Sequence, residues 1–272
     1  MSEDDCLKRY LMRIAAVVEY RGSGFSGWQH QKHAVSIQQL VEEALSRVAD
    51  QEIRVHCAGR TDRGVHALNQ VIHFDTEARR SEHSWLSGCN TYLSNDVCLL
   101  WAREIADDFH ARYSAIRRSY RYIIHNRKMR PVLNYDLVTW EYLPLDVNLM
   151  QQAAADLVGE YDFTSFRAAG CQSKVPVRDV QKLSVFRNGE YVVIEITANA
   201  FLQHMVRNMA GVLMAIGSGK ESPGWARQVL EARDRTKGGV TAAANGLYLT
   251  RVEYPDKYNI PGPAADSWPL LL

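Results

Sequence analysis

With 272 residues, the chain is long enough to bury a sizeable core and to form one large domain or two of roughly 100–150 residues. Its 46% apolar and 23% charged residues are typical of an ordinary soluble globular protein, and the formal net charge of +1 indicates no particular class of partner. The five cysteines are widely spaced and include no Cys-x-x-Cys pair, which argues against a disulfide framework or a zinc site and favours the reducing cytoplasm. The acidic residues 1–6 are unlike a signal peptide. The longest apolar stretch, 200–216, is interrupted by His204, Arg207 and Asn208 and is unlike a membrane span.

The N-terminal part of the chain predicts a β-α-β-β-α-β order of elements. Ser36 followed by Gln39 forms a capping-box pattern ahead of apolar residues at helical spacing. In chain order, the expected elements are a strand over 13–20, a helix over 37–48, strands over 53–57 and 69–75, a helix over about 81–93 and a strand over about 97–105. This order is the ferredoxin-like arrangement.

A second set of elements follows and suggests a related α/β unit. In chain order it consists of a strand over 119–125, a helix over about 146–157, a hairpin that turns at Asn188-Gly189 between strands over 183–186 and 191–196, helices over about 202–216 and 223–232, and a strand over 247–254. The expected halves are residues 1–108 and 109–272, with their sheets side by side. Residues 255–269 contain scattered Pro, Gly and Asp and predict an extended strap.

The ten residues from Cys57 to His66, Cys-Ala-Gly-Arg-Thr-Asp-Arg-Gly-Val-His, carry the most chemical information in the chain. Arg60 and Arg63 flank Asp62, and neighbouring positive charge favours the ionised form of a carboxylate. An ionised carboxylate on a tight, glycine-bounded loop is a candidate nucleophile or base. The alternative is a structural Asp that caps a turn and pairs with an arginine.

The segment from Arg112 to Arg130 contains many cationic residues and no Asp or Glu, which is typical of a polyanion-binding face. A solvated strand-and-loop surface is the alternative. The histidines form no His-Glu-x-x-His motif, and His30 and His33 lie in a polar loop, so we expect no metal site. The chain has neither a Walker loop nor a Gly-x-Gly-x-x-Gly motif, which disfavours nucleotide-dependent chemistry.

The stretch Gly59-Arg-Thr-Asp-x-Gly-Val-His-Ala67 closely resembles the signature of the bacterial tRNA pseudouridine synthase A family. Further blocks agree with that family in order and spacing: Glu19-Tyr20 with Gly27-Trp28-Gln29, Asp108-Phe-His-Ala-Arg112, Arg118-Ser-Tyr-Arg-Tyr122, Asp162-Phe-Thr-Ser-Phe166, Phe201 with His204-Met-Val-Arg-Asn208, and Gly246-Leu-Tyr-Leu249. The resemblance runs from about residue 13 to residue 260, which is nearly the whole chain. Separate blocks in the right order are far more specific than one short motif.

The resemblance implies an isomerase that needs no cofactor and converts uridines 38, 39 and 40 of the tRNA anticodon stem-loop to pseudouridine. It implies an α+β fold in which two ferredoxin-like halves form a continuous mixed sheet with a central active-site cleft. It also implies a homodimer, because members of the family resemble one another in this respect.

The same resemblance assigns roles to individual residues. Asp62 is expected to act as the nucleophile or as the stabiliser of positive charge at C1′, with Arg207 as the cation that keeps it charged. Tyr120 is expected to stack on the uracil, and its hydroxyl to exchange a proton with the sugar or base. Arg60 is expected to occupy the place vacated when the uridine leaves the base stack, and Leu247 to line the pocket. By pattern alone, Tyr120 and Leu247 are ordinary strand residues.

The resemblance further implies contacts to the tRNA backbone, which set position and not sequence. The expected residues are Arg80, Phe109, His110, Ala111, Arg112, Tyr113, Lys128, Gly170, Cys171, Gln172, Ser173 and Lys174. One residue departs from the family pattern: Arg63 stands where the family usually has a small residue. We expect Arg63 to contact a phosphate if it points into the cleft.

Three other readings stay open at the level of sequence. The first is an RNA-binding or RNA-chaperone protein without catalysis, which the joint presence of Asp62, Arg60, Tyr120 and Arg207 disfavours. The second is a pseudouridine synthase that modifies other tRNA positions or another RNA. The third is a hydrolase that uses Asp62 with His66, which lacks a helix to bring the two side chains together.

Overall fold

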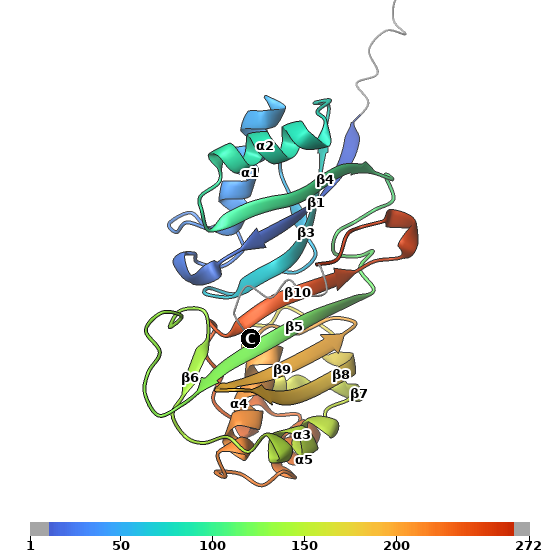
Figure 1. Cartoon of the computed structure of the whole chain (residues 1–272). Coiled ribbons are helices and arrows are strands. Elements are labelled where there is room, and N and C mark those ends of the chain that lie inside the picture. Colours follow the sequence, from blue (N-terminus) through green and yellow to red (C-terminus); the bar gives the residue numbers. More distant parts are fainter. Residues whose placement is uncertain (1–10, 264–272) are drawn as a thin grey trace, which may run out of the picture.

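The computed structural model describes residues 11–263, so Cys6 and the end of the expected strap lie outside the described residues. The strands form one ten-stranded mixed sheet in the order β4-β1-β3-β10-β5-β9-β8-β7, with β2 paired to β3 and β6 paired to β5. Figure 1 shows helices beside both halves of this sheet. The fold class expected from the sequence is confirmed.

The N-terminal half contains β1 (Met12–Tyr20), α1 (Ile37–Ala49), β2 (His56–Cys57), β3 (His66–Thr76), α2 (Glu82–Tyr92) and β4 (Val97–Ile105). The order β4-β1-β3-β2, antiparallel throughout, is that of the ferredoxin-like arrangement. Ser36 caps α1, and its Oγ accepts a hydrogen bond from Gln39 N at 3.3 Å. In a full capping box the Gln39 side chain would bond back to the backbone N–H of Ser36. Here it donates to Glu43 at 2.9 Å instead, so only the Ser36 half of the box is formed.

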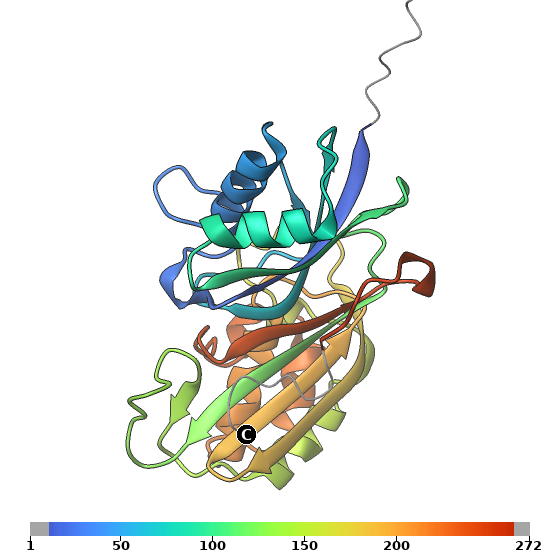
Figure 2. The ribbon, with the colours of Figure 1, turned by 45° about the horizontal axis from the view of Figure 1, so that its top comes forward.

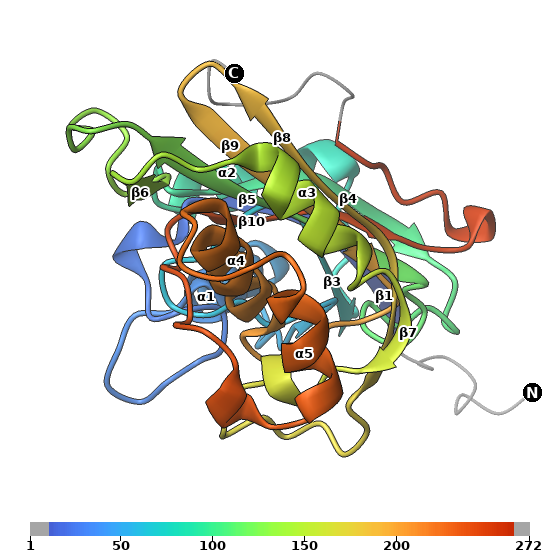
Figure 3. The same ribbon diagram turned by 90° about the horizontal axis from the view of Figure 1, so that it is seen from below.

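The C-terminal half contains β5 (Arg117–Asn126), β6 (Thr139–Glu141), α3 (Val147–Ala155), β7 (Gly159–Asp162), β8 (Val177–Asn188), β9 (Tyr191–Ala198), α4 (Met205–Gly217), α5 (Trp225–Ala232) and β10 (Leu247–Glu253). The hairpin turn at Asn188-Gly189 is confirmed, with Gly189 at φ 57°. Figure 3 shows α3, α4 and α5 gathered on one side of the sheet, with α3 beside β8.

Several expected boundaries are wrong. The strand expected over 53–57 is reduced to the two residues of β2, and β3 begins three residues before the expected start. The helix expected from residue 202 begins at Met205, because His204 adopts a left-handed conformation with φ 63° that interrupts helical geometry. The short strands β6 and β7 were not expected, since three or four residues are too few to show a periodicity.

The two halves join where β3 and β10 run parallel, through the pairs Tyr248–His66 and Leu249–Ala67. In Figures 1 and 2, β10 lies between β3 and β5, so the strands continue from one half into the other. Two main clusters of buried apolar side chains lie on either side of this junction. The domain boundary between residues 108 and 109 stays a prediction. Within residues 11–263, no helix combines the length and the apolarity that crossing a bilayer requires.

Candidate active site

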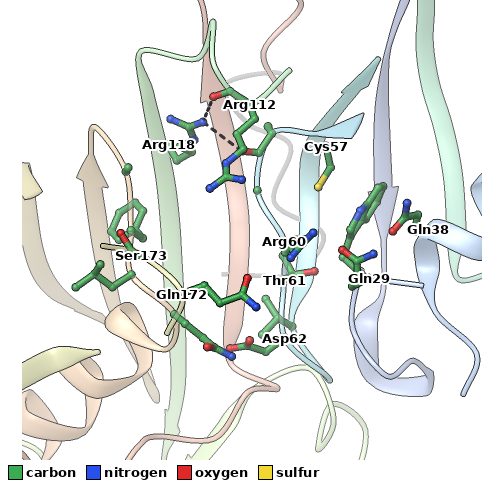
Figure 4. Close-up of a pocket in the computed structure, with 18 of the residues that line it drawn as sticks. Gln29, Gln38, Cys57, Arg60, Thr61, Asp62, Arg112, Arg118, Gln172 and Ser173 are labelled. Atoms are coloured by element: carbon green, nitrogen blue, oxygen red, sulfur yellow. Dashed lines mark hydrogen bonds between the residues drawn. The ribbon is translucent and has the colours of Figure 1, made fainter. Parts of the chain in front are cut away.

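A cleft of about 1530 Å³ lies between the two halves and is lined by residues from both. The N-terminal half supplies the loop from Cys57 to Arg63, and the C-terminal half supplies segments 170–173 and 200–206. Figure 4 shows Thr61 and Asp62 on one side of the cleft and Ser173 on the other. Segments far apart in sequence thus face the same space.

The backbone of the Asp62 loop is held by contacts outside the loop. Trp28 N donates to Thr61 O at 3.0 Å, and the Thr61 hydroxyl bonds the Tyr20 hydroxyl at 2.8 Å. Gly27 makes this approach possible, because its φ is 90° and a Cβ there would lie 2.8 Å from Thr61 O. The loop therefore presents Asp62 in a defined position.

The carboxylate of Asp62 faces an arginine and a histidine and does not cap the turn. Arg207 Nη1 and His204 Nε2 each lie 3.4 Å from the same oxygen, Asp62 Oδ2. Among the described residues, the turn uses the Asp62 backbone carbonyl, which accepts from Val65 N at 3.1 Å. The turn-capping alternative for this side chain therefore has no support.

Arg207 is held in place by hydrogen bonds to Ala242, in the segment that packs against α4. Its Nε donates to Ala242 O at 2.8 Å, and Ala242 N donates to Arg207 O at 3.1 Å. Its side chain is only 16% exposed. Arg207 is thus a positioned partner of Asp62 and not a helix-surface arginine. His204 is not among the residues that the sequence pattern singles out, although a polar residue in an apolar stretch three residues before Arg207 is a signal.

Tyr120 and Leu247 both line the cleft. They come from the neighbouring strands β5 and β10, and Tyr120 pairs with Leu249 across the ladder. The Tyr120 ring packs edge-on against Phe201, with centroids 5.0 Å apart. Burial raises the pKa of Tyr120 to about 12, so the phenol is protonated at neutral pH and is a hydrogen-bond donor.

Arg60 and Arg63 are exposed and line the cleft on the same side as Asp62. Among the described residues, neither has an ion-pair partner. Figure 4 places Arg60 beside Thr61 and Asp62. Two exposed guanidinium groups at the mouth of a cleft are available to a polyanion.

The segment from Phe109 to Tyr113 divides into anchors and exposed side chains. Phe109 and Ala111 are fully buried, so their side chains hold the segment to the core and are not available to RNA. Ala111 N donates to His73 Nδ1 at 3.1 Å, and Ala111 O accepts from Tyr254. The side chains of His110, Arg112 and Tyr113 line the cleft.

Arg118 connects this segment to the Asp62 loop without an acidic partner among the described residues. Its guanidinium donates to four carbonyl oxygens, those of Ala58, Arg112, Ala115 and Asn199. The bond to the Arg112 carbonyl can be followed in Figure 4 as a dashed line from Arg118. Burial lowers the pKa of Arg118 from its ordinary value, and within residues 11–263 its positive charge in the cleft wall has no ion-pair partner.

The rest of the basic segment does not form one polyanion-binding face. Arg117 pairs with Glu253, Arg121 with Glu195 and Arg127 with Glu190. Successive side chains of a strand point to opposite faces, and the neighbouring strands supply carboxylates that are absent from the segment itself. Only Arg112 and Arg118 of this segment's cations line the cleft.

The remaining residues expected to contact RNA also divide into those that line the cleft and those that do not. Gly170, Cys171, Gln172 and Ser173 line the cleft, whereas Lys174, Arg80 and Lys128 are exposed outside its lining. Arg80 lies just ahead of α2 and donates to Val48 O at 3.0 Å. Lys174, Arg80 and Lys128 can contact a tRNA only if the tRNA extends beyond the cleft.

His66 lies in the interior and uses both ring nitrogens away from Asp62. Gly22 N donates to its Nδ1 at 3.0 Å, and its Nε2 lies 3.2 Å from Asn245 O. The first contact requires an unprotonated Nδ1, so the proton resides on Nε2. Burial lowers the pKa of His66 to about 4. A hydrolase that uses Asp62 with His66 has no support in this geometry.

Comparison with known proteins gives a consistent assignment. A family model described as tRNA pseudouridine synthase matches residues 16–114 and 153–255. A tRNA pseudouridine synthase A of Methylococcus capsulatus is 59% identical over 249 residues, which are 92% of each chain. Proteins of the same name from Legionella pneumophila (strain Corby) and Coxiella burnetii (strain Dugway 5J108-111) are 56% and 52% identical, over 93% and 92% of this chain and 98% and 96% of theirs.

Similarity to solved structures is much weaker. A chain of a Cbf5–Nop10–Gar1 complex aligns with a TM-score of 0.35 and 10% identity, over 86% of this chain and 57% of that chain, and nothing is concluded from it. The family model and the relatives, in contrast, cover both halves and the Asp62 loop. This chain therefore belongs to the tRNA pseudouridine synthase family.

Proposed function

We propose that the protein converts uridine to pseudouridine at positions 38, 39 and 40 of the tRNA anticodon stem-loop, without a cofactor. The observation that carries this proposal is the Asp62 carboxylate, which faces a cleft built by both halves and contacts Arg207 at 3.4 Å. A carboxylate fixed beside a cation in a cleft is placed to act as a nucleophile.

The reaction breaks the C1′–N1 bond, turns the uracil while it is held, and joins C5 to C1′. C5 then loses its proton and N1 gains one, so the product is an isomer of uridine. Asp62 acts on the sugar, acts on the base, or assists elimination across C1′–C2′, and each route needs an ionised carboxylate at this place. Tyr120 and Leu247 form the part of the wall that stacks on and confines the uracil. The raised pKa of Tyr120 favours donation of a hydrogen bond by its hydroxyl over proton removal.

The target uridine is stacked in the stem-loop and must leave the stack to reach Asp62. Arg60 is two residues from Asp62, is exposed and has no ion-pair partner among the described residues. In our proposal it enters the space that the uridine leaves. Arg112, Arg118 and segment 170–173 carry the tRNA backbone, because they combine positive charge with backbone amides along the cleft. A homodimer, which the resemblance implies, and a cytoplasmic location stay predictions.

Tritium release from tRNA labelled with [5-³H]uridine tests the proposal, because bonding of C1′ to C5 expels that hydrogen. The wild-type protein, Asp62→Asn and the control Asp96→Asn are compared; Asp96 is an exposed carboxylate outside the cleft lining. We expect release by wild type and by Asp96→Asn, and none by Asp62→Asn, with tRNA binding retained in all three.

Two results would replace the proposal. If no tRNA releases tritium while binding stays tight, the protein is an RNA-binding protein without this activity. If tritium is released but the pseudouridine maps outside positions 38–40, the reaction is retained and the site assignment is wrong.

A further inference from the structure

His204 and Arg207 approach Asp62 in an unusual way, because both contact one oxygen of the carboxylate. His204 Nε2 and Arg207 Nη1 each lie 3.4 Å from Oδ2. Within residues 11–263, Oδ1 accepts no hydrogen bond from the protein. One oxygen is thus contacted by two side chains, and the other is left for a ligand in the cleft.

The backbone of His204 is also uncommon. Its φ of 63° and ψ of 2° lie in the left-handed region, which non-glycine residues rarely occupy and which concentrates at functional sites. His204 is the N-cap residue of α4, yet its side chain makes no capping hydrogen bond. The imidazole lines the cleft instead, with 31% of the side chain exposed.

The residue before His204 links this turn to one of the expected RNA-contacting segments. Ala168 N donates to Gln203 O at 2.9 Å, and segment 170–173 lines the cleft directly afterwards. His204 therefore contacts Asp62 and directly follows a residue whose backbone is bonded just ahead of that segment. Through His204, RNA bound at segment 170–173 can affect the position of the Asp62 carboxylate.

A single contact to a carboxylate oxygen sets its distance but leaves the group free to rotate about its bond to Cβ. A second contact, from a residue three positions away on the α4 turn, limits that rotation. The orientation of a nucleophile matters because a small misplacement lowers the rate without weakening binding. We propose that His204 is a positioning residue that, together with Arg207, holds Oδ2 so that Oδ1 of Asp62 faces the substrate. This proposal rests on the proposed role of Asp62.

The variant His204→Gly tests it, because glycine adopts the left-handed conformation readily and the imidazole alone is removed. Asp50→Gly is the matched control: Asp50 also has a left-handed backbone, at φ 55°, and ends α1 away from the cleft lining. For both variants and wild type, the single-turnover rate of tritium release, the Kd for tRNA and the Tm are measured.

We expect His204→Gly to lower the single-turnover rate by roughly 10- to 100-fold, with the Kd for tRNA and the Tm unchanged. Asp50→Gly should match wild type in rate. Added imidazole should recover part of the rate of His204→Gly, because the imidazole site is open to the cleft, and should not affect Asp50→Gly.

Three results would overturn the inference. A rate for His204→Gly within twofold of wild type would mean that the side chain is not needed. A Kd that weakens as much as the rate falls would make His204 an RNA contact. A loss that imidazole does not recover would assign the effect to the backbone. If wild type itself releases no tritium, the proposed function fails, and the inference fails with it; the wild-type measurement separates this case from the other three.

Discussion

His66 stacks on Tyr248 with ring centroids 4.6 Å apart and 18° between the ring planes, at the point where β3 of one half pairs with β10 of the other. The same imidazole accepts from Gly22 N and contacts Asn245 O. His66 thus ends the Asp62 loop and joins segments of both halves. Its contacts fix the junction at which the loop ends and β3 begins.

The neutral state of His66 predicts a loss of stability in acid. Burial lowers its pKa from 6.5 to about 4 in the folded protein, so the unfolded chain binds more protons between these values. The stability that the neutral ring contributes is present above pH 6.5 and is lost as the pH falls towards 4. The shift corresponds to roughly 3 kcal/mol at most.

Urea unfolding from pH 7 to pH 4 measures this effect. We expect His66→Gln to be less stable than wild type at pH 7, and the difference to shrink as the pH falls. His83→Gln, which alters an exposed histidine, should follow the wild-type pH dependence. A His66→Gln curve parallel to wild type would show that His66 does not titrate as described.

Arg207→Gln removes the cation that Asp62 contacts and keeps a side chain that can still donate to Ala242 O. Because a fixed charge beside a reacting group acts mainly on the transition state, we expect a loss of about 10²- to 10³-fold in the single-turnover rate. The Kd for tRNA should change little, since the Arg207 side chain is only 16% exposed. The control is Arg227→Gln, which should keep full activity. Arg227 lies on α5 and contacts Asp156. Equal losses in rate and affinity would contradict the assignment.

Arg63→Ala tests the phosphate contact that we expect of this residue. Arg63 is exposed and lines the cleft, so its removal should weaken tRNA binding and lower the slope of log Kd against log salt by about one. Lys220→Ala removes an exposed cation outside the cleft lining and should leave both quantities unchanged. Affinity that is unaltered at every salt concentration would remove Arg63 from the interface.

Gly211→Ala tests the packing behind Arg207. A Cβ at Gly211 would lie 1.9 Å from Val240 O, so the segment that carries Ala242 must shift away from α4. We expect a loss of about 1–3 kcal/mol in the free energy of unfolding, together with a lower rate, because Ala242 O holds Arg207. Gly224→Ala meets nothing within 4 Å and should be close to neutral in urea unfolding. A stable, fully active Gly211→Ala protein would contradict this account.

Much of the fold follows from short-range patterns. The Ser36 cap, the Asn188-Gly189 turn and the apolar periodicities act within a few residues, so the positions of most helices and strands can be predicted. The start of α4 could not, because the left-handed residue His204 interrupts a run that is otherwise helical in pattern. The short strands β6 and β7 exist because longer strands offer them an edge to pair with.

The sequence by itself determined the family resemblance, the order of the two ferredoxin-like sets and the choice of Asp62, because these depend on residues that are neighbours in the chain. Only the tertiary structure determined which charged side chains contact one another. Arg207 reaches Asp62 across 145 residues, and His204 reaches the same oxygen. It also decided that Arg117, Arg121 and Arg127 are paired with carboxylates while Arg112 and Arg118 line the cleft. The physical reason is that a side chain's electrostatic partner is set by strand pairing and helix packing between distant segments, which no local pattern records.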